Sequence, residues 1–516
     1  MYTLSFLSAQ QLVKDEEAMC EMLESVPCIV YDVLFKVAYR ENKTKLLCDM
    51  VMTWPYSQFK FQKLLQTCWC SSRSSSRNCQ ECWESLDYNE STGNKIKAII
   101  GGGLRYIWKV TMNNSQQLPR RILKQMDMTG LVSSDTCWDR NLMILWTHSI
   151  DAFRNYNSSQ QQTDDPQNQR GDQMAEGSPV STKETHVALL VDLQLTSFLW
   201  EFLKEILENN TNNYLHLKCR NFCTSYTFLR DYVKCFALLD SLAICRMDLR
   251  YSKITLMDSK WLMSQLTTLQ SLQSLFLPSF RIDEKKNAAL AQKTDIQILA
   301  AELGKLKHLR ELSIHCLCLS DLVEYLLRDL PYSLESLQLS YCSLTEKDLS
   351  YMAQSHHSAH LIKLGLSGNR LKEQLDSFLK LLKSVSNSLK WLNITKCGLN
   401  DINFYETSSY LYSCTNLSHL GLYGNPLSKR SLTAFLEPSP HKLLNMKIIS
   451  VPIFLDCYRN LPQHLSYLRT PEQYVESSDF VSILNEIKST QLTRGDLAIA
   501  VTYDSLSDVG DYFDLR

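Results

Sequence analysis

The chain contains little glycine and little proline for its length, with 15 Gly and 13 Pro among 516 residues. This scarcity excludes collagen-like and glycine-rich low-complexity architectures and favours regular helices and strands. A chain of 516 residues also exceeds what one globular core normally organises. We therefore expect several domains or one elongated repeat array.

Long apolar runs and a basic leader are also missing. No stretch approaches the roughly 18 uncharged apolar residues that span a bilayer, and the start "MYTLSFLSAQQLVKDEE" is a poor targeting signal. We expect a cytoplasmic chain whose 18 Cys are reduced thiols. A formal net charge of -1 gives no general reason to expect nucleic acid or an anionic membrane as a partner.

Signatures of catalysis are absent as well: there is no phosphate-binding loop, nucleophile elbow, zinc-protease helix or dinucleotide fingerprint. The "GGGLR" that begins at Gly101 lacks a following Lys-Ser/Thr pair, and we interpret it as a break between two apolar segments. The "HHSAH" with His356, His357 and His360 is interpreted as a solvated loop, with a metal site as the alternative. We expect no enzyme and no cofactor.

The sequence does contain an internal repeat. "LIKLGLSGNRL" begins at Leu361 and "LSHLGLYGNPL" begins at Leu417, each with leucine at places one, four, six and eleven and Asn at place nine. Other copies, some of them weaker, begin at Ile244, Leu272, Leu309, Leu334, Leu389 and Leu443.

The spacing between copies is close to 28 residues except for one longer interval, which holds the polar "RIDEKKNAALAQKTD" that we interpret as an insertion. This period is that of leucine-rich repeats. The predicted fold class is α/β: a leucine-rich repeat horseshoe with long strand-helix repeats and an N-terminal helical cap.

The strand of each repeat alternates its side chains. Leucines at places four and six point to one side, while the residues between them point to the other. The ninth place lies where the chain bends, and an Asn amide there can satisfy backbone groups that the bend leaves unpaired. Cys can occupy the same slot, which predicts a bend ladder of Cys342, Asn369, Cys397 and Asn425.

Helices are predicted between the strands. The stripe of Leu375, Phe378, Leu379 and Leu382 has helical spacing. Thr345 with Asp348 has the spacing of a capping box, and Ser428 is placed to cap a third helix.

The repeat region is predicted to be a solenoid over residues 123–455, with regular repeats over 244–453. Its early, irregular turns include "LKQMDMTGL" from Leu123, "VALLVDLQL" from Val187 and "YLHLKCRNF" from Tyr214. The polar, Gln-rich stretch 155–185 is predicted to be a disordered loop within this array.

The flanks of the solenoid differ from it in character. Residues 1–65 predict a helical cap with one helix around Leu12 to Leu23, a second over Val30 to Tyr39 and a third that ends before Pro55. Residues 66–122 are interpreted as a Cys/Ser-rich insert followed by a helix, and residues 456–516 as a C-terminal cap.

The insert holds four cysteines, Cys68, Cys70, Cys79 and Cys82. Four thiolates are able to hold tetrahedral zinc, but the spacing is not that of a standard zinc ribbon and the filler is rich in serine. Reduced or redox-sensitive thiols are therefore favoured, and no metal is assigned.

Function is expected on the inner face of the strands, where stacked repeats line up their variable places into one surface. Aromatic residues and arginine are enriched at interaction hot spots. The predicted partner-binding residues are Arg250, Tyr251, Phe276, His315, Tyr341, Trp391 and Tyr423.

Several stretches of the chain resemble a known family. They are the run from "LESVPCIVYDVLF" to "FKFQKLLQ", "MDMTGL", "HSAHLIKLGLSGNRL" and "LGLYGNPLS", together with "TWP" at Thr53–Pro55 and "DCY" at Asp456–Tyr458. On these motifs the chain resembles the family of PRAME and leucine-rich repeat-containing protein 14. The resemblance runs from "MYTLSFLS" to "DYFDL" and fails only in insertions.

This resemblance implies two functions, neither of which follows from period or composition. The first is negative regulation of Toll-like-receptor signalling to NF-κB, by binding the beta subunit of the IκB kinase complex and disrupting its assembly. The alternative is a substrate-recognition subunit of a cullin-2 ubiquitin ligase that docks elongins B and C. The docking motif for elongins is degraded here, because Leu64 and Cys68 are followed by Ser72 where a hydrophobic residue belongs.

Overall fold

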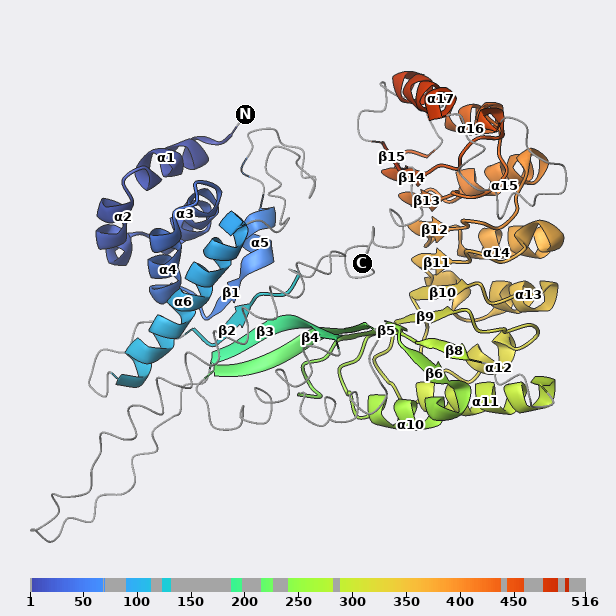
Figure 1. Ribbon diagram of the computed structural model, residues 1–516, viewed down its shortest axis with the longest axis horizontal. Helices are drawn as coiled ribbons and strands as arrows, with labels where there is room; N and C mark the ends of the chain where they lie inside the picture. Colours follow the sequence, from blue (N-terminus) through green and yellow to red (C-terminus); the bar gives the residue numbers. More distant parts are fainter. Residues whose placement is uncertain are drawn as a thin grey trace, which may run out of the picture. The chain divides into compact units, whose positions relative to one another are not determined.

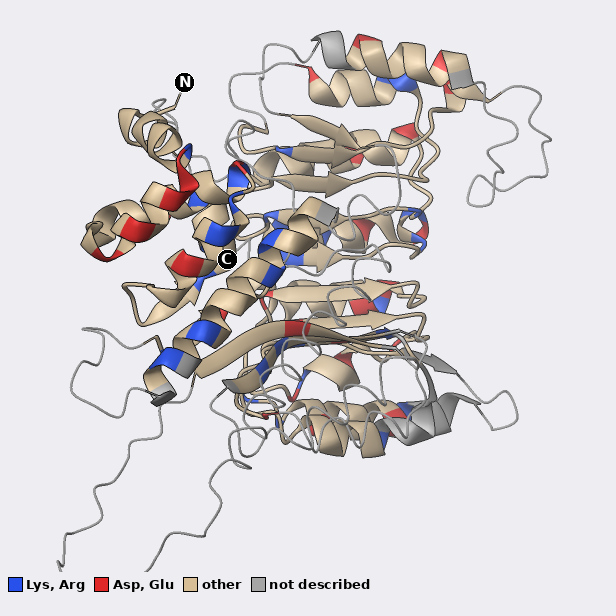
Figure 2. Cartoon of the chain, turned by 60° about the vertical axis from the view of Figure 1, so that its left-hand side comes forward, with Lys and Arg blue, Asp and Glu red and all other residues tan. Residues whose placement is uncertain are grey.

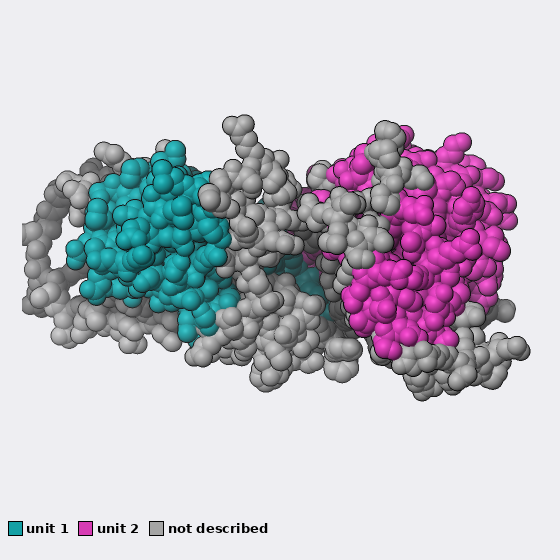
Figure 3. All heavy atoms as spheres, turned by 90° about the horizontal axis from the view of Figure 1, so that it is seen from above, with its two compact units in different colours: residues 1–244 teal, residues 245–516 magenta. Residues whose placement is uncertain are grey.

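The computed structural model describes residues 2–67, 69, 90–112, 123–130, 187–196, 215–225, 240–281, 288–437, 443–458, 477–490 and 497–500. The chain forms two compact units, Met1–Ile244 and Cys245–Arg516 (Figure 3). Cys68, Cys70, Cys79, Cys82 and the Gln-rich stretch 155–185 lie outside the described residues.

The first unit opens with short helices (Figure 1). They are α1 (Leu4–Val13), α2 (Glu16–Met22), the 3-10 turn η1 (Leu23–Ser25), α3 (Cys28–Arg40), α4 (Thr44–Met52), α5 (Phe61–Gln66) and the longer α6 (Glu90–Met112).

The first predicted helix is in fact two helices. Asp15 interrupts it, because its backbone is extended and its carboxylate accepts a hydrogen bond from the Ala18 N–H at 3.1 Å. An Asp in this position caps the start of a new helix more favourably than it continues an old one. The second and third predicted helices are confirmed as α3 and α4.

The "GGG" of residues 101–103 lies inside α6, so the predicted break at Gly101 is wrong. A Cβ on Gly102 would lie 2.2 Å from the backbone oxygen of Cys48 in α4, and one on Gly103 would lie 2.4 Å from the Met126 sulfur. Glycine therefore allows α6 to pack closely against its neighbours, and this packing outweighs the poor helix propensity of glycine.

Four parallel strands are described in the first unit, in the order β1-β2-β3-β4. Their bounds are β1 Gln58–Lys60, β2 Gln125–Asp127, β3 Val187–Thr196 and β4 Leu215–Ser225. The last three lie in the three upstream stretches read as irregular turns. β1 was not predicted, because its three residues are too few to show an alternation.

The second unit is a regular array of parallel strands with helices along one face (Figure 1). Its main sheet runs in the order β5 (Arg246–Tyr251), β7 (Ser274–Phe276), β9 (Glu311–His315), β10 (Ser336–Ser340), β11 (Lys363–Gly365), β12 (Trp391–Asn393), β13 (His419–Gly421), β14 (Ile448–Ser450) and β15 (Ala498–Ala500). A separate two-stranded sheet pairs β6 (Lys253–Thr255) with β8 (Ser279–Arg281).

The helices of this unit are α10 (Leu256–Leu266), α11 (Ala288–Leu303), α12 (Val323–Leu327), α13 (Glu346–Gln354), α14 (Leu375–Val385), α15 (Asp401–Ser413), α16 (Lys429–Leu436) and α17 (Ser477–Thr490). Short 3-10 turns complete it at η3 (Ser358–His360), η4 (Leu371–Gln374) and η5 (Leu455–Cys457).

The sheet register stacks equal places of successive repeats. Leu337 pairs with Leu364, which pairs with Leu392, which pairs with Leu420, and all four hold place four. Each of these leucines is at most 1% exposed. The predicted fold class, a leucine-rich repeat α/β array with N-terminal helices, is confirmed.

Local helix predictions also hold. The Thr345 and Asp348 side chains form a capping box at the start of α13, and the Ser428 hydroxyl accepts a hydrogen bond from the Ser431 N–H at the start of α16. The predicted apolar stripe lies on α14, with Phe378 and Leu382 fully buried.

One prediction about the array is wrong. The last repeat begins three residues later than Leu443, because Ile448 pairs with His419 at place three and Ile449 with Leu420 at place four. The stretch interpreted as an insertion, residues 281–295, includes the first half of α11, and the second half of this helix buries Ile296, Leu299 and Leu303.

Asn369 joins neighbouring repeats at the bend. Its Oδ1 accepts hydrogen bonds from the backbone N–H groups of Cys342 and Leu344, both at 3.2 Å. Its Nδ2 donates to the carbonyls of Leu339 at 2.7 Å and Leu366 at 2.9 Å. Asn425, two repeats further along the chain, makes the equivalent four hydrogen bonds.

The two cysteines of the ladder use their thiols instead. Cys342 Sγ donates to the Ile314 carbonyl at 3.6 Å, and Cys397 Sγ donates to the Leu366 carbonyl at 3.2 Å. Burial raises the pKa of both thiols to about 12, which keeps them protonated and able to donate.

The residue before the bend takes left-handed backbone angles in five successive repeats. Place eight has a φ of 56° at Cys316, 57° at Tyr341, 72° at Gly368, 55° at Lys396 and 70° at Gly424. Only glycine adopts this region without strain. In these five repeats the bend thus has the same backbone geometry, whichever residue occupies place eight.

Within the described part of the chain, no helix combines the length and apolar character needed to cross a bilayer.

Candidate functional site

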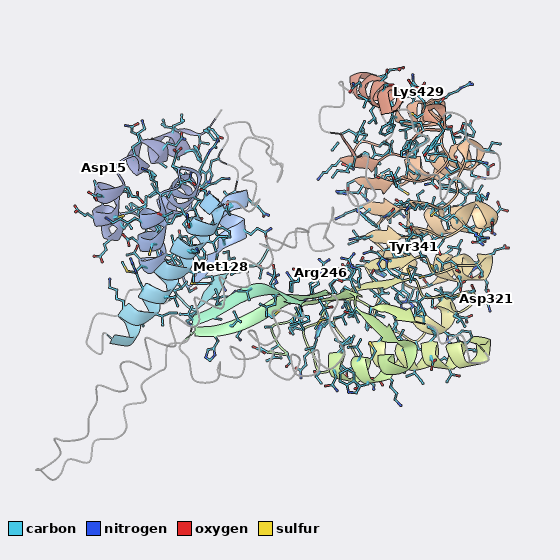
Figure 4. The ribbon with its side chains drawn as sticks, in the orientation of Figure 1. Asp15, Met128, Arg246, Asp321, Tyr341 and Lys429 are labelled. Carbon is cyan, nitrogen blue, oxygen red and sulfur yellow. The ribbon has the colours of Figure 1, made fainter. Side chains whose placement is uncertain are left out.

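The inner face of the second unit is the sheet face opposite its helices (Figure 1). Strand alternation places the residues of places three, five and seven on it. We call this surface, over β5 to β14, the inner face. Figure 4 labels Arg246 and Tyr341, which lie at the first repeat of the unit and at the bend after β10.

A first cluster forms on β5 and β7 around Phe276. The guanidinium carbons of Arg246 and Arg250 each lie 4.7 Å from the centre of its ring. The Phe276 side chain is 2% exposed. Cation–π contacts of this kind hold the two arginines over the ring.

Arg250 is also held by a carboxylate. Its Nη2 donates to Asp248 Oδ2 at 2.7 Å and its Nε donates to Asp248 Oδ1 at 3.0 Å. Burial disfavours the charge of Asp248, but the Arg250 guanidinium outweighs burial and holds the pKa of this carboxyl below its usual value. The pair is therefore an ion pair with fixed geometry.

His315 extends the cluster onto β9. Its Nε2 lies 2.8 Å from the Ser313 hydroxyl. Burial lowers the pKa of His315 to about 4, and the positive charge of Arg250 acts in the same direction. The imidazole is neutral at pH 7 and contributes a hydrogen-bonding group rather than a charge.

A second cluster surrounds Trp391 on β12. The indole is 1% exposed and packs against Ile362, which directly precedes β11, and Ile448, which begins β14. The Lys363 ammonium lies 4.7 Å from the ring centre. We call this group the Trp391 cluster.

Lys363 also joins a buried polar network. Its Nζ lies 3.8 Å from Glu311 Oε1, and the two side chains are 4% and 0% exposed. Glu311 further accepts hydrogen bonds from the hydroxyls of Ser274 at 2.5 Å and Ser336 at 2.9 Å. A buried carboxylate is tolerated only when it is paired and hydrogen-bonded in this way.

The predicted tyrosines occupy the bend side of the inner face. The Tyr341 side chain is 37% exposed, and a Cβ on Gly368 would lie 2.3 Å from its ring, so the ring covers that glycine. Tyr423 is partly buried at place seven of its repeat. Tyr251 ends β5, but its side chain lies outside what the structure describes.

The structure thus brings Arg250, Phe276 and His315 into one cluster and places Trp391 in another. Phe276 and Trp391, both predicted to bind a partner, have buried rings. Sequence reasoning also left Glu311 and Lys363 unassigned. Their signal was available: both are charged residues at place three of a repeat.

The histidine loop was predicted to be solvated, and this prediction is wrong for His357. His357 is 1% exposed. Its Nδ1 accepts a hydrogen bond from the Leu334 N–H at 3.1 Å, and its Nε2 lies 3.2 Å from the Leu327 carbonyl, to which it donates. His356 and His360 are exposed. His357 therefore ties two repeats together.

Chemically, the inner face is suited to recognition. Its charges are largely paired, its histidines are neutral, and its aromatic rings carry cations on their faces. Among the residues that the structure describes, no group of three or more His, Cys, Asp or Glu side chains is placed to hold a metal ion.

Comparison with protein families gives two matches. A family model described as the PRAME C-terminal domain matches residues 187–465, and one described as the PRAME N-terminal domain matches residues 3–72. The first match spans more than half of the chain and includes the inner face.

Individual relatives extend the similarity over the whole chain. Leucine-rich repeat-containing protein 14 of Mus musculus is 32% identical over 519 residues, and that of Homo sapiens is 31% identical over 518 residues, with 100% of both chains covered in each case. Oogenesin-2 of Mus musculus is 23% identical over 482 residues, which cover 90% of this chain and 87% of that protein.

Proposed function

This chain belongs to the family of PRAME and leucine-rich repeat-containing protein 14, and on that premise we propose that it is a non-enzymatic scaffold that binds a protein partner on its inner face. The observation that carries the proposal is the inner face itself, where aromatic and cationic side chains from successive repeats adjoin one another. Stacked repeats commonly use such a surface for binding.

The partner we propose is the beta subunit of the IκB kinase complex. By binding it, the chain would disrupt assembly of the complex and act in the cytoplasm as a negative regulator of Toll-like-receptor signalling to NF-κB. The support for this partner is family membership and full-length similarity to leucine-rich repeat-containing protein 14.

Reconstitution with purified proteins tests this function. Increasing amounts of the chain are added to the assembled kinase complex, which is then separated by size. We expect the scaffold subunit of the complex to be released as the chain binds the beta subunit. A complex that stays intact at saturating chain would reject the proposed function.

A second candidate, docking of elongins B and C for a cullin-2 ubiquitin ligase, is favoured by the exposed apolar surface and the cavity of the N-terminal helices. The N-terminal helices present apolar side chains to solvent: Leu4 is 80% exposed, Leu12 is 55% exposed and Ile29 is 82% exposed. A cavity of about 440 Å³ also opens beside α1, lined by Leu7, Gln10, Gln11, Val13, Lys14, Glu41 and Lys43.

The residues of the docking motif weigh against this candidate. Leu64, the anchor of the degraded motif, is only 6% exposed in α5, while Cys68 and Ser72 lie outside the described residues. The helix α2, which follows α1 in the chain, is also strongly acidic, with Glu16, Glu17 and Glu21 (Figure 2).

Co-purification tests the ligase role. Elongins B and C recovered with the chain from cells would establish this role, and their absence would favour the scaffold that sequesters the kinase subunit.

A further inference from the structure

Exposed apolar side chains gather in the first three helices of the chain. Of the eleven large hydrophobic side chains that are exposed among the described residues, five lie within the first 29 residues: Leu4, Leu7, Leu12, Met22 and Ile29. Single exposed apolar residues are ordinary on a protein surface, but several of them on one group of packed helices indicate an interaction surface. The first unit therefore offers such a surface in addition to the inner face of the second unit.

Helix α2 gives this group of helices a negative charge. From Asp15 to Glu24 the sequence reads "DEEAMCEMLE", with five carboxylates and no lysine or arginine. Asp15, which Figure 4 labels, caps the start of α2, and Figure 2 shows further acidic residues along the helix. The charge of α2 is thus of one sign.

One side of α2 packs on the rest of the first unit. Met19 is 5% exposed, and Leu23, which follows α2 in η1, is 2% exposed. Glu16 belongs to this side, because its Oε1 accepts a hydrogen bond from the Leu46 N–H in α4 at 2.9 Å. These contacts determine which side of α2 faces outward.

The outward side of α2 carries two adjoining rows of side chains. Glu17 and Glu21 are one turn apart, and Glu24 continues their row into η1. The side chains of Glu17 and Glu24 are 86% and 82% exposed. Ala18 and Met22, also one turn apart, are both exposed and form the second row, in which Met22 is 57% exposed. An acidic row therefore runs beside an apolar row.

The acidic row is only weakly neutralised by lysines of this chain. Lys45 Nζ lies 3.8 Å from Glu17 Oε1, and the lysine side chain is 60% exposed. Lys109 Nζ lies 3.8 Å from Glu24 Oε1, and this lysine side chain is 50% exposed. Ion pairs with such exposure contribute little and are screened by salt. The carboxylates therefore keep most of their capacity to attract a cationic partner.

We propose that the outward side of α2 is a docking surface for a basic amphipathic helix of a protein partner. The apolar row of the partner helix packs against Ala18 and Met22, and a neighbouring row of Lys or Arg faces Glu17, Glu21 and Glu24. Such rows match because both helices repeat their faces every three to four residues. Met22 suits this role, since methionine adapts its shape to an apolar partner.

The charge of this surface disfavours other classes of occupant. Nucleic acid and anionic membranes present phosphate groups, which the acidic row repels. A second copy of the chain, docked about a two-fold axis, would bring the same carboxylates together. Opposite charge on a protein segment, by contrast, favours association and sets its orientation.

This docking surface adds a second site to the scaffold and does not rest on the proposed function. Helix α2 belongs to the first unit, whereas the inner face belongs to the second. A chain with both sites can hold a basic partner while the inner face binds another protein. Failure of the kinase complex to respond to the chain would leave this inference standing.

Titration of the full chain with synthetic helical peptides tests the proposal. The first peptide carries a row of leucines beside a row of lysines, the second has glutamate in place of each lysine, and the third has the composition of the first in scrambled order. We expect the first peptide to bind, with an affinity that falls as salt is added. The other two should bind at least about tenfold more weakly. Fluorescence anisotropy of the labelled peptides measures the affinities.

Variants of the chain locate the binding. The triple change Glu17→Gln, Glu21→Gln and Glu24→Gln should weaken binding of the first peptide by about tenfold, the effect of three exposed ion pairs. Glu16 stays unchanged because it holds the start of α4. The matched control removes equal charge from exposed positions of the second unit and should leave the affinity unchanged. It combines Asp329→Asn, Glu346→Gln and Glu373→Gln.

The apolar row is tested in the same way. Met22→Ser should weaken the first peptide several-fold, whereas Leu444→Ser, at a position 73% exposed in the second unit, should not. Absence of binding by the first peptide, equal binding by the scrambled peptide, or equal losses in the two triple variants would overturn the proposal. So would dimerisation of the chain that the Glu17/Glu21/Glu24 variant abolishes, since the occupant would then be a second copy.

Discussion

At the scale of single residues, the bend ladder shows how one side chain holds two repeats together. Asn369 satisfies two N–H groups of the preceding bend and donates to two carbonyls. These backbone groups are buried, and each would cost free energy if left unpaired. The Asn369 amide thus pairs buried backbone groups at the bend that the hydrogen bonds of the strands and helices leave unpaired.

Replacing Asn369 by Ala should lower the free energy of unfolding by about 2 to 4 kcal/mol, because buried groups lose their partners. Asn369→Cys is the matched control, since Cys342 and Cys397 hold the same slot in other repeats. We expect the Cys variant to lose less than the Ala variant in denaturant titrations. Equal losses would show that the polar contacts of this slot contribute little.

His357 makes stability depend on pH. Burial lowers its pKa to about 4 in the folded chain, although its hydrogen bond to the Leu327 carbonyl opposes this, against an ordinary value of 6.5. Between these two values the unfolded chain binds more protons, so stability is full above pH 6.5 and is lost as the pH falls toward 4.

For this one histidine, the loss between pH 7 and pH 5 amounts to about 2 kcal/mol. His357→Gln keeps a donor and an acceptor but does not titrate, so its unfolding free energy should fall less over the same range. Denaturant titrations at the two pH values measure the difference. Identical pH dependence in the two chains would contradict the assignment.

At the scale of elements, the helices of successive repeats are capped across the repeat boundary. Asp348, at the start of α13, accepts hydrogen bonds from the N–H groups of Asp321 at 3.0 Å and Val323 at 3.1 Å, at the start of α12. Figure 4 labels Asp321 in this region. The capping box of α13 thus stabilises two helix starts rather than one.

Asp348→Ala should therefore loosen both α12 and α13, at a cost of about 1 to 3 kcal/mol. The exposed Asp376, in the first turn of α14, is the matched control, and Asp376→Ala should have a small effect. Amide hydrogen exchange over residues 321–327 and 346–354 measures the change. Faster exchange in α13 alone would show that the cap does not reach across repeats.

The helix α6 shows a case in which helix propensity predicts the wrong local structure. Three consecutive glycines at residues 101–103 favour a break in any isolated helix, yet they lie within α6. Close approach to Cys48 requires Gly102 to lack a side chain. The requirement comes from residues about fifty positions away, so no local pattern announces it.

At the scale of the whole molecule, binding of a partner depends on which side chains of the inner face are exposed. Tyr341 retains 37% of its accessible surface, while Phe276 and Trp391 are buried. Tyr341 is therefore the aromatic residue of this set best placed to meet a partner first.

Tyr341→Ala should weaken binding to the kinase beta subunit by about tenfold, which corresponds to about 1.4 kcal/mol. Ile402→Ala is the matched control, because Ile402 is 69% exposed on α15, on the helical side. Titration of labelled chain with the beta subunit gives both affinities. A Tyr341 variant that binds like the Ile402 variant would place the interface elsewhere.

The sequence by itself determined the repeat, its period, the buried leucines and the helix caps at Thr345 and Ser428, because these are local patterns imposed by strand and helix geometry. Only the tertiary structure decided the start of the last repeat, the place of the glycines in α6 and the burial of Trp391. These features depend on contacts between residues that are distant in the chain, and such contacts form only when the repeats stack.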